Sequence, residues 1–278
     1  MCGSESIAVK VHSPGGDHLL GCSACGTLFH AGDKSSPGRP EGADVGHSPA
    51  TVYGPRARIR ITLLCRAIAR AYSEYLESRI DISRVATVFE IGSQYGHLLR
   101  LLRRRGVDAC GVDANPGAVE RGVLQAPFLR HLEWTPETPF PTGLDLIIIP
   151  QVIYYFRQAD VLLQRALKAV KRGGYVFLAT VNLDEARVVR RALALEAEYA
   201  GRGLTPQSNS CLPTRQGLMA FCREQGVQII DCTPVEPVVR FDDSPGPLFL
   251  LRYEVLRRPA YVERSTGYHL HLILQRQA

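Results

Sequence analysis

The spacing of apolar residues predicts a long helix followed by alternating strands and helices. Over residues 57–72 apolar side chains recur three and four positions apart with arginines opposite, which predicts an amphipathic helix. Short apolar runs then predict strands at 85–91, 107–112, 128–132, 144–149 and 175–181. Amphipathic stretches predict helices at 97–105, from Pro116 and at 159–171, and later a helix from Thr214 and a strand at 227–231. This alternation is typical of an open, doubly wound, mostly parallel α/β sheet with helices on both faces.

Composition divides the chain into three parts. Residues 1–30 have few periodic apolar positions but several cysteines and histidines, which favours a small head before the main domain. Residues 31–55 are rich in glycine, proline and serine and are expected to form a linker or a lid. Residues 56–278 carry the alternating pattern and are expected to form the main domain.

Hydropathy and cysteine content favour a cytoplasmic protein without a membrane span. The longest apolar stretch, residues 144–156, is interrupted by polar residues and is well short of the roughly 20 residues that a membrane span needs. The first residues carry no secretory signal, so the eight cysteines are expected to stay reduced in the cytoplasm. All but four of the 33 basic residues are arginine, which would suit a nucleic acid only if they gathered on one face. We therefore expect no membrane partner and do not favour a nucleic-acid partner, which stays open as an alternative, and the pattern carries no signal for an oligomeric state.

The segment that carries the chemistry is a strand, a glycine-containing turn and a helix. The strand ends at Glu90, and Gly92 and Gly96 in the turn let the backbone pass close to a ligand where a Cβ atom would collide. The next strand ends at Asp113, which can accept hydrogen bonds from the two hydroxyls of a ribose. Because ligands bind at the carboxyl ends of strands in such sheets, a cofactor that contains a nucleoside is expected here.

The charge at this turn favours S-adenosylmethionine over a dinucleotide. A dinucleotide site has Gly-x-Gly-x-x-Gly, but Gln94 and His97 stand at the second and third glycine positions. Glu90 would also place a carboxylate near a diphosphate, which is electrostatically unfavourable, whereas it suits a cofactor with a cationic tail. An NAD-dependent oxidoreductase is the first alternative. A non-catalytic cofactor-binding scaffold that contacts nucleic acid is the second.

At these residues the chain resembles the class I S-adenosylmethionine-dependent methyltransferases. Their first motif is acid-x-Gly-x-Gly-x-Gly, and Gln94 replaces its middle glycine. The matching positions and segments, in order, are Glu90, Gly92, Gly96, Asp113, residues 145–156 and residues 167–182. The resemblance implies a Rossmann-like fold, S-adenosylmethionine as cofactor, and methyl transfer to a small molecule. The acceptor would be a sugar or a natural-product-like compound with an oxygen, nitrogen or carbon nucleophile.

The resemblance also implies which residues bind the cofactor. They are Glu90, Gly92, Ser93, Tyr95, Gly96, Asp113, Ala114, Asn115, Glu133, Trp134, Pro150 and Gln151. Two aromatic members of this set have a second interpretation. Trp134 could stack on the adenine or belong to the core, and Tyr95 could cover the cofactor or face solvent.

The candidate catalytic residues follow the fourth predicted strand. Gln151, Tyr154 and Tyr155 stand where the family lines the methyl-transfer site. Tyrosine, with an ordinary pKa near 10, is a poor base at neutral pH but can orient a hydroxyl or an amine. Sequence alone therefore identifies no catalytic base.

The head contains a cysteine knuckle. Cys22 and Cys25 are separated by two residues and followed by glycine, a spacing typical of half a tetrahedral zinc site. Cys2 and a histidine, of which His18 is our choice over His12 and His30, are expected to complete the site. The head resembles the zinc ribbon that precedes some bacterial methyltransferases of sugars and natural products, which implies a structural zinc ion. The alternative is a degenerate ribbon that keeps the shape without metal.

Overall fold

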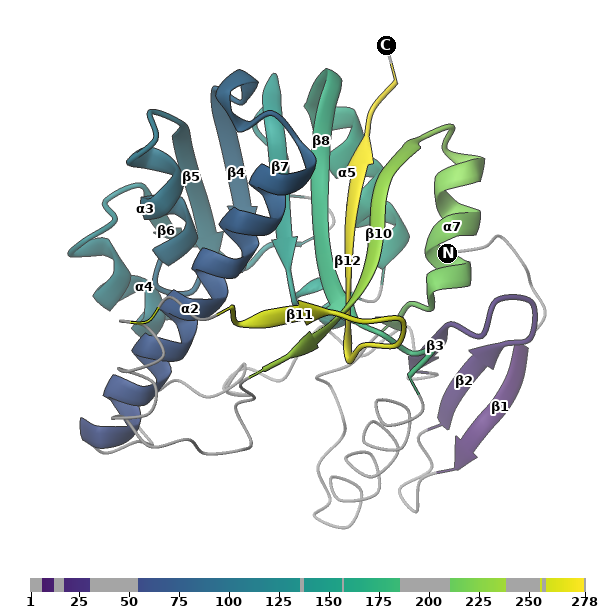
Figure 1. Cartoon of the computed structure of the whole chain (residues 1–278). Helices are drawn as coiled ribbons and strands as arrows, with labels where there is room; N and C mark the ends of the chain where they lie inside the picture. The colour runs from purple at the N-terminus through teal and green to yellow at the C-terminus, as the bar shows by residue number, and fades with distance from the viewer. Residues whose placement is uncertain are drawn as a thin grey trace.

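The computed structural model describes residues 7–12, 18–30, 55–135, 138–156, 158–185, 211–238, 256 and 259–277. Its centre is an eight-stranded sheet with the order β11-β10-β12-β8-β7-β4-β5-β6 (Figure 1). The strands are β4 (Thr87–Ile91), β5 (Asp108–Asp113), β6 (Leu129–His131), β7 (Leu144–Pro150), β8 (Val170–Val181), β10 (Gln228–Pro237), β11 (Tyr261–Glu263) and β12 (His269–Gln275). Neighbouring strands from β6 to β8 are parallel, whereas β12 runs antiparallel to both β8 and β10. The predicted doubly wound, mostly parallel fold is confirmed.

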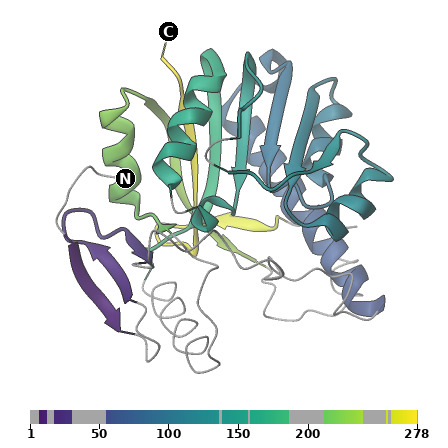
Figure 2. The ribbon, with the colours of Figure 1, turned by 180° about the vertical axis from the view of Figure 1, so that it is seen from behind.

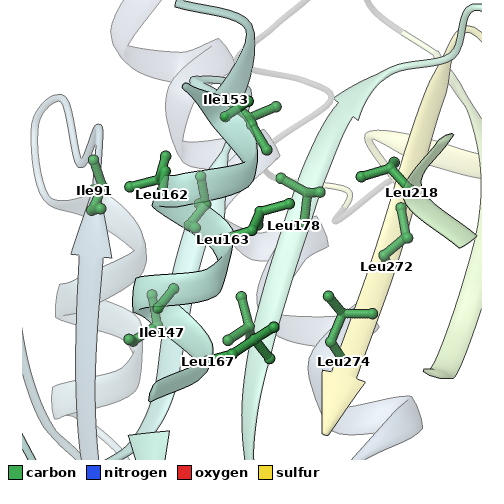
Figure 3. Close-up of a cluster of buried hydrophobic side chains, with 14 of the residues drawn as sticks. Ile91, Ile147, Ile153, Leu162, Leu163, Leu167, Leu178, Leu218, Leu272 and Leu274 are labelled. Carbon is green, nitrogen blue, oxygen red and sulfur yellow. The ribbon is translucent and has the colours of Figure 1, made fainter. Parts of the chain in front are cut away.

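Helices cover both faces of this sheet, as the alternation predicted. They are α2 (Pro55–Arg79), α3 (His97–Arg103), α4 (Pro116–Val123), α5 (Ala159–Ala169) and α7 (Arg215–Glu224), with short 3-10 helices η1 (Ile82–Arg84) and η2 (Ile153–Tyr155). Figure 1 shows α2 crossing one face, and Figure 2 shows α5 and α7 on the other. Successive side chains of β7 point to opposite faces of the sheet: Ile147 packs on the α5 side and Ile148 on the α2 side. Figure 3 shows the leucine-rich cluster on the α5 side.

The carboxyl-terminal part of the sheet differs most from the prediction. The strand predicted at 227–231 extends as β10 to Pro237. The pattern did not indicate β12, which lies between β8 and β10. Its sequence carries His269 and His271 on the face where an inward apolar residue would be expected, so its alternation does not stand out.

A second, four-stranded sheet links the head to the main domain. It has the order β1-β2-β3-β9, with β1 (Ile7–His12), β2 (His18–Cys22), β3 (Leu28–His30) and β9 (Cys211–Leu212). Thr214, the N-cap of α7, donates to the Cys25 carbonyl, and Gln216 Nε2 donates to the Ala24 carbonyl at 3.0 Å. The head is therefore held by a strand and a helix end from much later in the chain. The predicted linker or lid lies outside the described residues up to position 54.

None of the helices in the described ranges is long and apolar enough to cross a membrane.

His271 is a buried imidazole enclosed by aromatic rings beneath α2. It is 1% exposed, and neither ring nitrogen has a hydrogen-bond partner. The rings of Tyr72, Tyr75 and Tyr261 have centroids 5.4, 4.9 and 5.0 Å away. Burial, with a contribution from His269, lowers the pKa of His271 well below its ordinary value. The folded protein therefore keeps this ring neutral.

This ring should make the fold sensitive to acid. Below about pH 6.5 the unfolded chain takes up a proton at His271 that the folded chain does not, so stability must fall as the pH falls. We expect wild type to lose up to about 1.4 kcal/mol more per pH unit than His271→Phe between pH 6 and pH 5. Urea unfolding at both pH values measures the difference. His131→Gln, which replaces an exposed imidazole, is the control, and parallel curves for wild type and His271→Phe would contradict the assignment.

Candidate functional site

The glycine turn after β4 adopts the left-handed backbone that its glycines permit. Gly92 has φ 81° and Gly96 has φ 67°. The backbone N–H groups of Gly92 and Ser93 both donate to the Val112 carbonyl, at 2.8 and 3.0 Å, which ties the turn to β5. A Cβ atom on Gly92 would lie 2.3 Å from Val152 Cγ1. Position 92 thus requires glycine because the turn packs closely against the segment after β7.

Asp113 joins the end of β5 to the same turn. Its carboxylate accepts the backbone N–H of Gln94 at 2.7 Å and that of Asn115 at 2.8 Å. The side chain is 8% exposed; burial raises its pKa, and the two N–H bonds oppose that rise. Gln94, where the motif has glycine, takes a left-handed conformation with φ 47°, and its Oε1 accepts from the Cys65 thiol of α2 at 3.1 Å. Gln94 therefore preserves the shape of the turn although it departs from the motif.

Glu90 presents a buried carboxyl oxygen without a partner. The side chain is 3% exposed, and Oε2 makes no hydrogen bond. Burial raises the pKa of Glu90 to about 8, with the charge of Asp113 contributing and Ser93 opposing. Such an oxygen fits a cationic ligand group and disfavours a diphosphate. These residues fit the amino-acid end of S-adenosylmethionine.

Several other predicted cofactor residues surround this turn. The Ser93 hydroxyl donates to the Glu90 carbonyl at 3.1 Å, and the Tyr95 ring lies 5.8 Å from that of His97. Asn115 is the N-cap of α4, its Oδ1 accepting the Ala118 N–H at 3.1 Å, while the Ala114 carbonyl lies 3.2 Å from a ring nitrogen of His131. The β4 and β5 ends thus bring together most of the predicted set.

Trp134 belongs to the core. It is 7% exposed, and its ring packs against Phe140 at 4.5 Å and Phe89 at 5.3 Å between centroids. Of the two roles that the sequence left open, the core role matches this packing. Glu133, beside it, is exposed.

The predicted acceptor side begins where β7 ends. Pro150 is the last residue of β7, and Gln151 follows with φ 56°, its N–H donating to the Ala179 carbonyl at 2.7 Å. Tyr154 and Tyr155 lie on η2 with ring centroids 4.7 Å apart. A left-handed conformation in a residue other than glycine is strained and often marks a functional position.

Two tyrosines that the sequence did not single out lie beside these residues. The Tyr72 hydroxyl of α2 lies 3.3 Å from the Tyr261 hydroxyl of β11, and the two rings stack at 5.6 Å. The pattern indicated only that Tyr72 lies on the apolar face of the helix predicted over residues 57–72. The meeting of α2 with a late strand has no local signal in the sequence.

Of the four predicted zinc ligands, the structure describes the side chains of two, Cys22 and Cys25. Cys22 and Cys25 are buried in the predicted knuckle, where the Gly26 N–H donates to the Cys22 carbonyl at 2.7 Å. His18 begins β2 and Cys22 ends it, and His18 as the fourth ligand stays a prediction. Cys2 lies outside the described residues. Among the residues that the structure describes, no three His, Cys, Asp or Glu side chains could hold a metal ion, so a structural zinc ion is not supported.

The strand order, the glycine turn and the two strand-end acids define an S-adenosylmethionine-dependent methyltransferase of class I. The family model described as a methyltransferase domain matches residues 56–231. The chain belongs to this family and is an S-adenosylmethionine-dependent methyltransferase.

Solved structures share the fold at low sequence identity. A methyltransferase from Thermotoga maritima, described as a possible histamine N-methyltransferase, is 15% identical, with TM-score 0.53, over 78% of this chain and 93% of its own. An S-adenosylmethionine-dependent methyltransferase from Mesorhizobium loti is 14% identical, with TM-score 0.50, over 74% and 98%. The mitomycin 7-O-methyltransferase MmcR is 14% identical, with TM-score 0.50, over 78% of this chain but only 54% of its own length. A comparison with curated proteins gave no match.

The contact between Gly92 and Val152 can be tested against a matched glycine. Gly106 also has a left-handed backbone, with φ 86°, but nothing lies within 4 Å of an added Cβ. Gly106→Ala should therefore cost about 1–2 kcal/mol of stability from backbone strain alone. Gly92→Ala should cost about 2 kcal/mol more, because the Cβ meets Val152.

Urea unfolding measures both losses. Adding Val152→Ala to Gly92→Ala should recover most of the excess, and binding of S-adenosylhomocysteine should recover with it. Equal losses in the two alanine variants would show that the turn and the segment after β7 are not in the contact described.

Proposed function

We propose that the protein transfers the methyl group of S-adenosylmethionine to a small-molecule acceptor with an oxygen, nitrogen or carbon nucleophile. The observation that carries the proposal is the buried, unpartnered Oε2 of Glu90. Glu90 lies near the carboxyl end of β4, and Asp113 ends the neighbouring strand β5. A carboxyl oxygen that lacks a partner in the free protein is ready for a cation.

Each part of the cofactor has a fitting group in this proposal. Glu90 faces the ammonium and sulfonium end. Asp113 accepts from the ribose hydroxyls through the lone pairs that remain after its two backbone N–H bonds. The turn that contains Ser93, Tyr95 and Gly96, together with Ala114 and Asn115, covers the sugar, and Pro150 and Gln151 border the methyl group. Glu133, which is exposed, is the candidate for the adenine edge, with Trp134 beside it in the core.

Glu90 gives the proposal a test that does not depend on knowing the acceptor. With its pKa at about 8, the carboxyl is mostly protonated at pH 7 in the free protein. A bound cation lowers that pKa, so cofactor binding at pH 7 should release most of one proton and tighten as the pH rises toward 8. Isothermal titration calorimetry in buffers of different ionisation enthalpy measures the proton count. Glu90→Gln should bind more weakly and release none.

NAD serves as the comparison ligand in the same titrations. Binding of NAD in place of S-adenosylmethionine would favour the oxidoreductase alternative and overturn the proposal. Cofactor binding without a proton difference between wild type and Glu90→Gln would show that Glu90 does not face the cationic end.

A further inference from the structure

Four side chains from three parts of the chain form a cluster beside the cofactor site. The tyrosine cluster consists of Tyr72 of α2, Tyr154 of η2, Tyr261 of β11, and Gln151. Tyr72 lies at its centre, with its hydroxyl 3.3 Å from that of Tyr261 and the two rings stacked. Gln151 and Tyr154 lie near Tyr72, since Tyr154 raises the pKa of its hydroxyl and Gln151 lowers it. The cluster therefore lies at the carboxyl end of β7, where Gln151 follows Pro150.

Gln151 brings a hydrogen-bond donor to this cluster. Its backbone is held left-handed by the bond from its N–H to the Ala179 carbonyl. Its Nε2 atom is buried and makes no hydrogen bond of ordinary geometry in the free protein. A buried amide donor without an acceptor costs about 1–3 kcal/mol, so a ligand atom that accepts this hydrogen in good geometry would recover part of that energy.

The cluster is uncharged and cannot act as a base near neutral pH. Burial raises the pKa of Tyr72 and of Tyr154 well above the ordinary value, and raises that of Tyr261 to about 12. After burial, the largest effect on Tyr72 and on Tyr154 comes from a neighbouring tyrosine. These hydroxyls therefore remain protonated and can donate hydrogen bonds.

We propose that the tyrosine cluster binds the oxygen of a phenolic or enolic acceptor as an anion, with Gln151 Nε2 and the Tyr72–Tyr261 hydroxyl pair as hydrogen-bond donors. This inference rests on the proposed function. The acceptor gives its hydroxyl proton to water. A lone pair of the resulting oxygen anion then forms the bond to the methyl carbon as the carbon–sulfur bond breaks. The sulfur keeps that electron pair, and the products are a methyl ether and S-adenosylhomocysteine.

The hydrogen-bond donors in the cluster favour phenolic or enolic acceptors over alcohols and amines. An ordinary alcohol such as a sugar hydroxyl ionises too weakly without a base, and the cluster supplies none. An amine becomes a cation on methylation and would be best served by a carboxylate, whereas the cluster presents donors. Hydrogen-bond donors placed where negative charge resides stabilise an oxyanion, and a phenol or an enol supplies that charge itself.

The probe 4-nitrophenol tests the site, because its anion absorbs visible light and its ionisation can be read without turnover. In wild type with S-adenosylhomocysteine bound, we expect the pKa of the bound probe to fall by about one unit relative to free solution, a tenfold preference for the anion. Gln151→Leu and the double variant Tyr72→Phe with Tyr261→Phe should each remove most of that shift. Tyr175→Phe, which changes a tyrosine in the middle of β8 that pairs with Leu146 of β7, should leave it intact.

The outcomes separate this inference from the proposed function. If S-adenosylhomocysteine does not bind wild type, the proposed function fails. If it binds but the probe does not bind, or its pKa is unchanged, or the phenylalanine variants keep the shift, the inference alone is overturned. Thermal melting confirms that each variant is folded, and Tyr72→Phe alone, which keeps the ring, serves if the double variant does not fold. In a turnover assay phenols should be methylated, and a preference for amines or sugars would also overturn it.

Discussion

The carboxylate of Asp113 is the interaction on which the site depends. Its two oxygens each accept a backbone N–H, one from Gln94 in the turn after β4 and one from Asn115 before α4. Hydrogen bonds to a charged group contribute about 1.5–3 kcal/mol each. The left-handed backbone of Gln94 costs roughly 1–2 kcal/mol. The bond from the Gln94 N–H is therefore large enough to offset the strain at that residue, so a glutamine can stand where the motif has a glycine.

Helix α2 connects this turn to the acceptor side. Cys65 contacts Gln94, Tyr72 contacts Tyr261, and Tyr75 donates to Asp231 of β10. These three residues are seven and three positions apart, so they lie along one face of the helix. A single rigid element thus sets the distance between the cofactor turn and the tyrosine cluster, while its other contacts reach the antiparallel half of the sheet.

Sequence predicted the part of the structure that local patterns determine. The strands from β4 to β8 are short apolar runs that end in turns, so they were recognisable, and the residues predicted to bind the cofactor lie mostly at those ends. Tyr261 and the strand β12 were not, because their places depend on pairing with distant segments. The zinc ligands of the head stay a prediction, because Cys2 lies outside the described residues. For Trp134 the residue type allowed two roles, and only the packing distinguishes them.

The pairing of β3 with β9 has a consequence for the order of events during synthesis. Strand β3 leaves the ribosome early, but its partner, Cys211–Leu212, follows only after residues 31–210 have been made. At ordinary translation rates this interval is on the order of 10 s or more. Throughout it the outer edge of β3 has no native partner, and unpaired strand edges are prone to association with other chains. The nascent head is thus exposed to misassociation until the main domain is nearly complete.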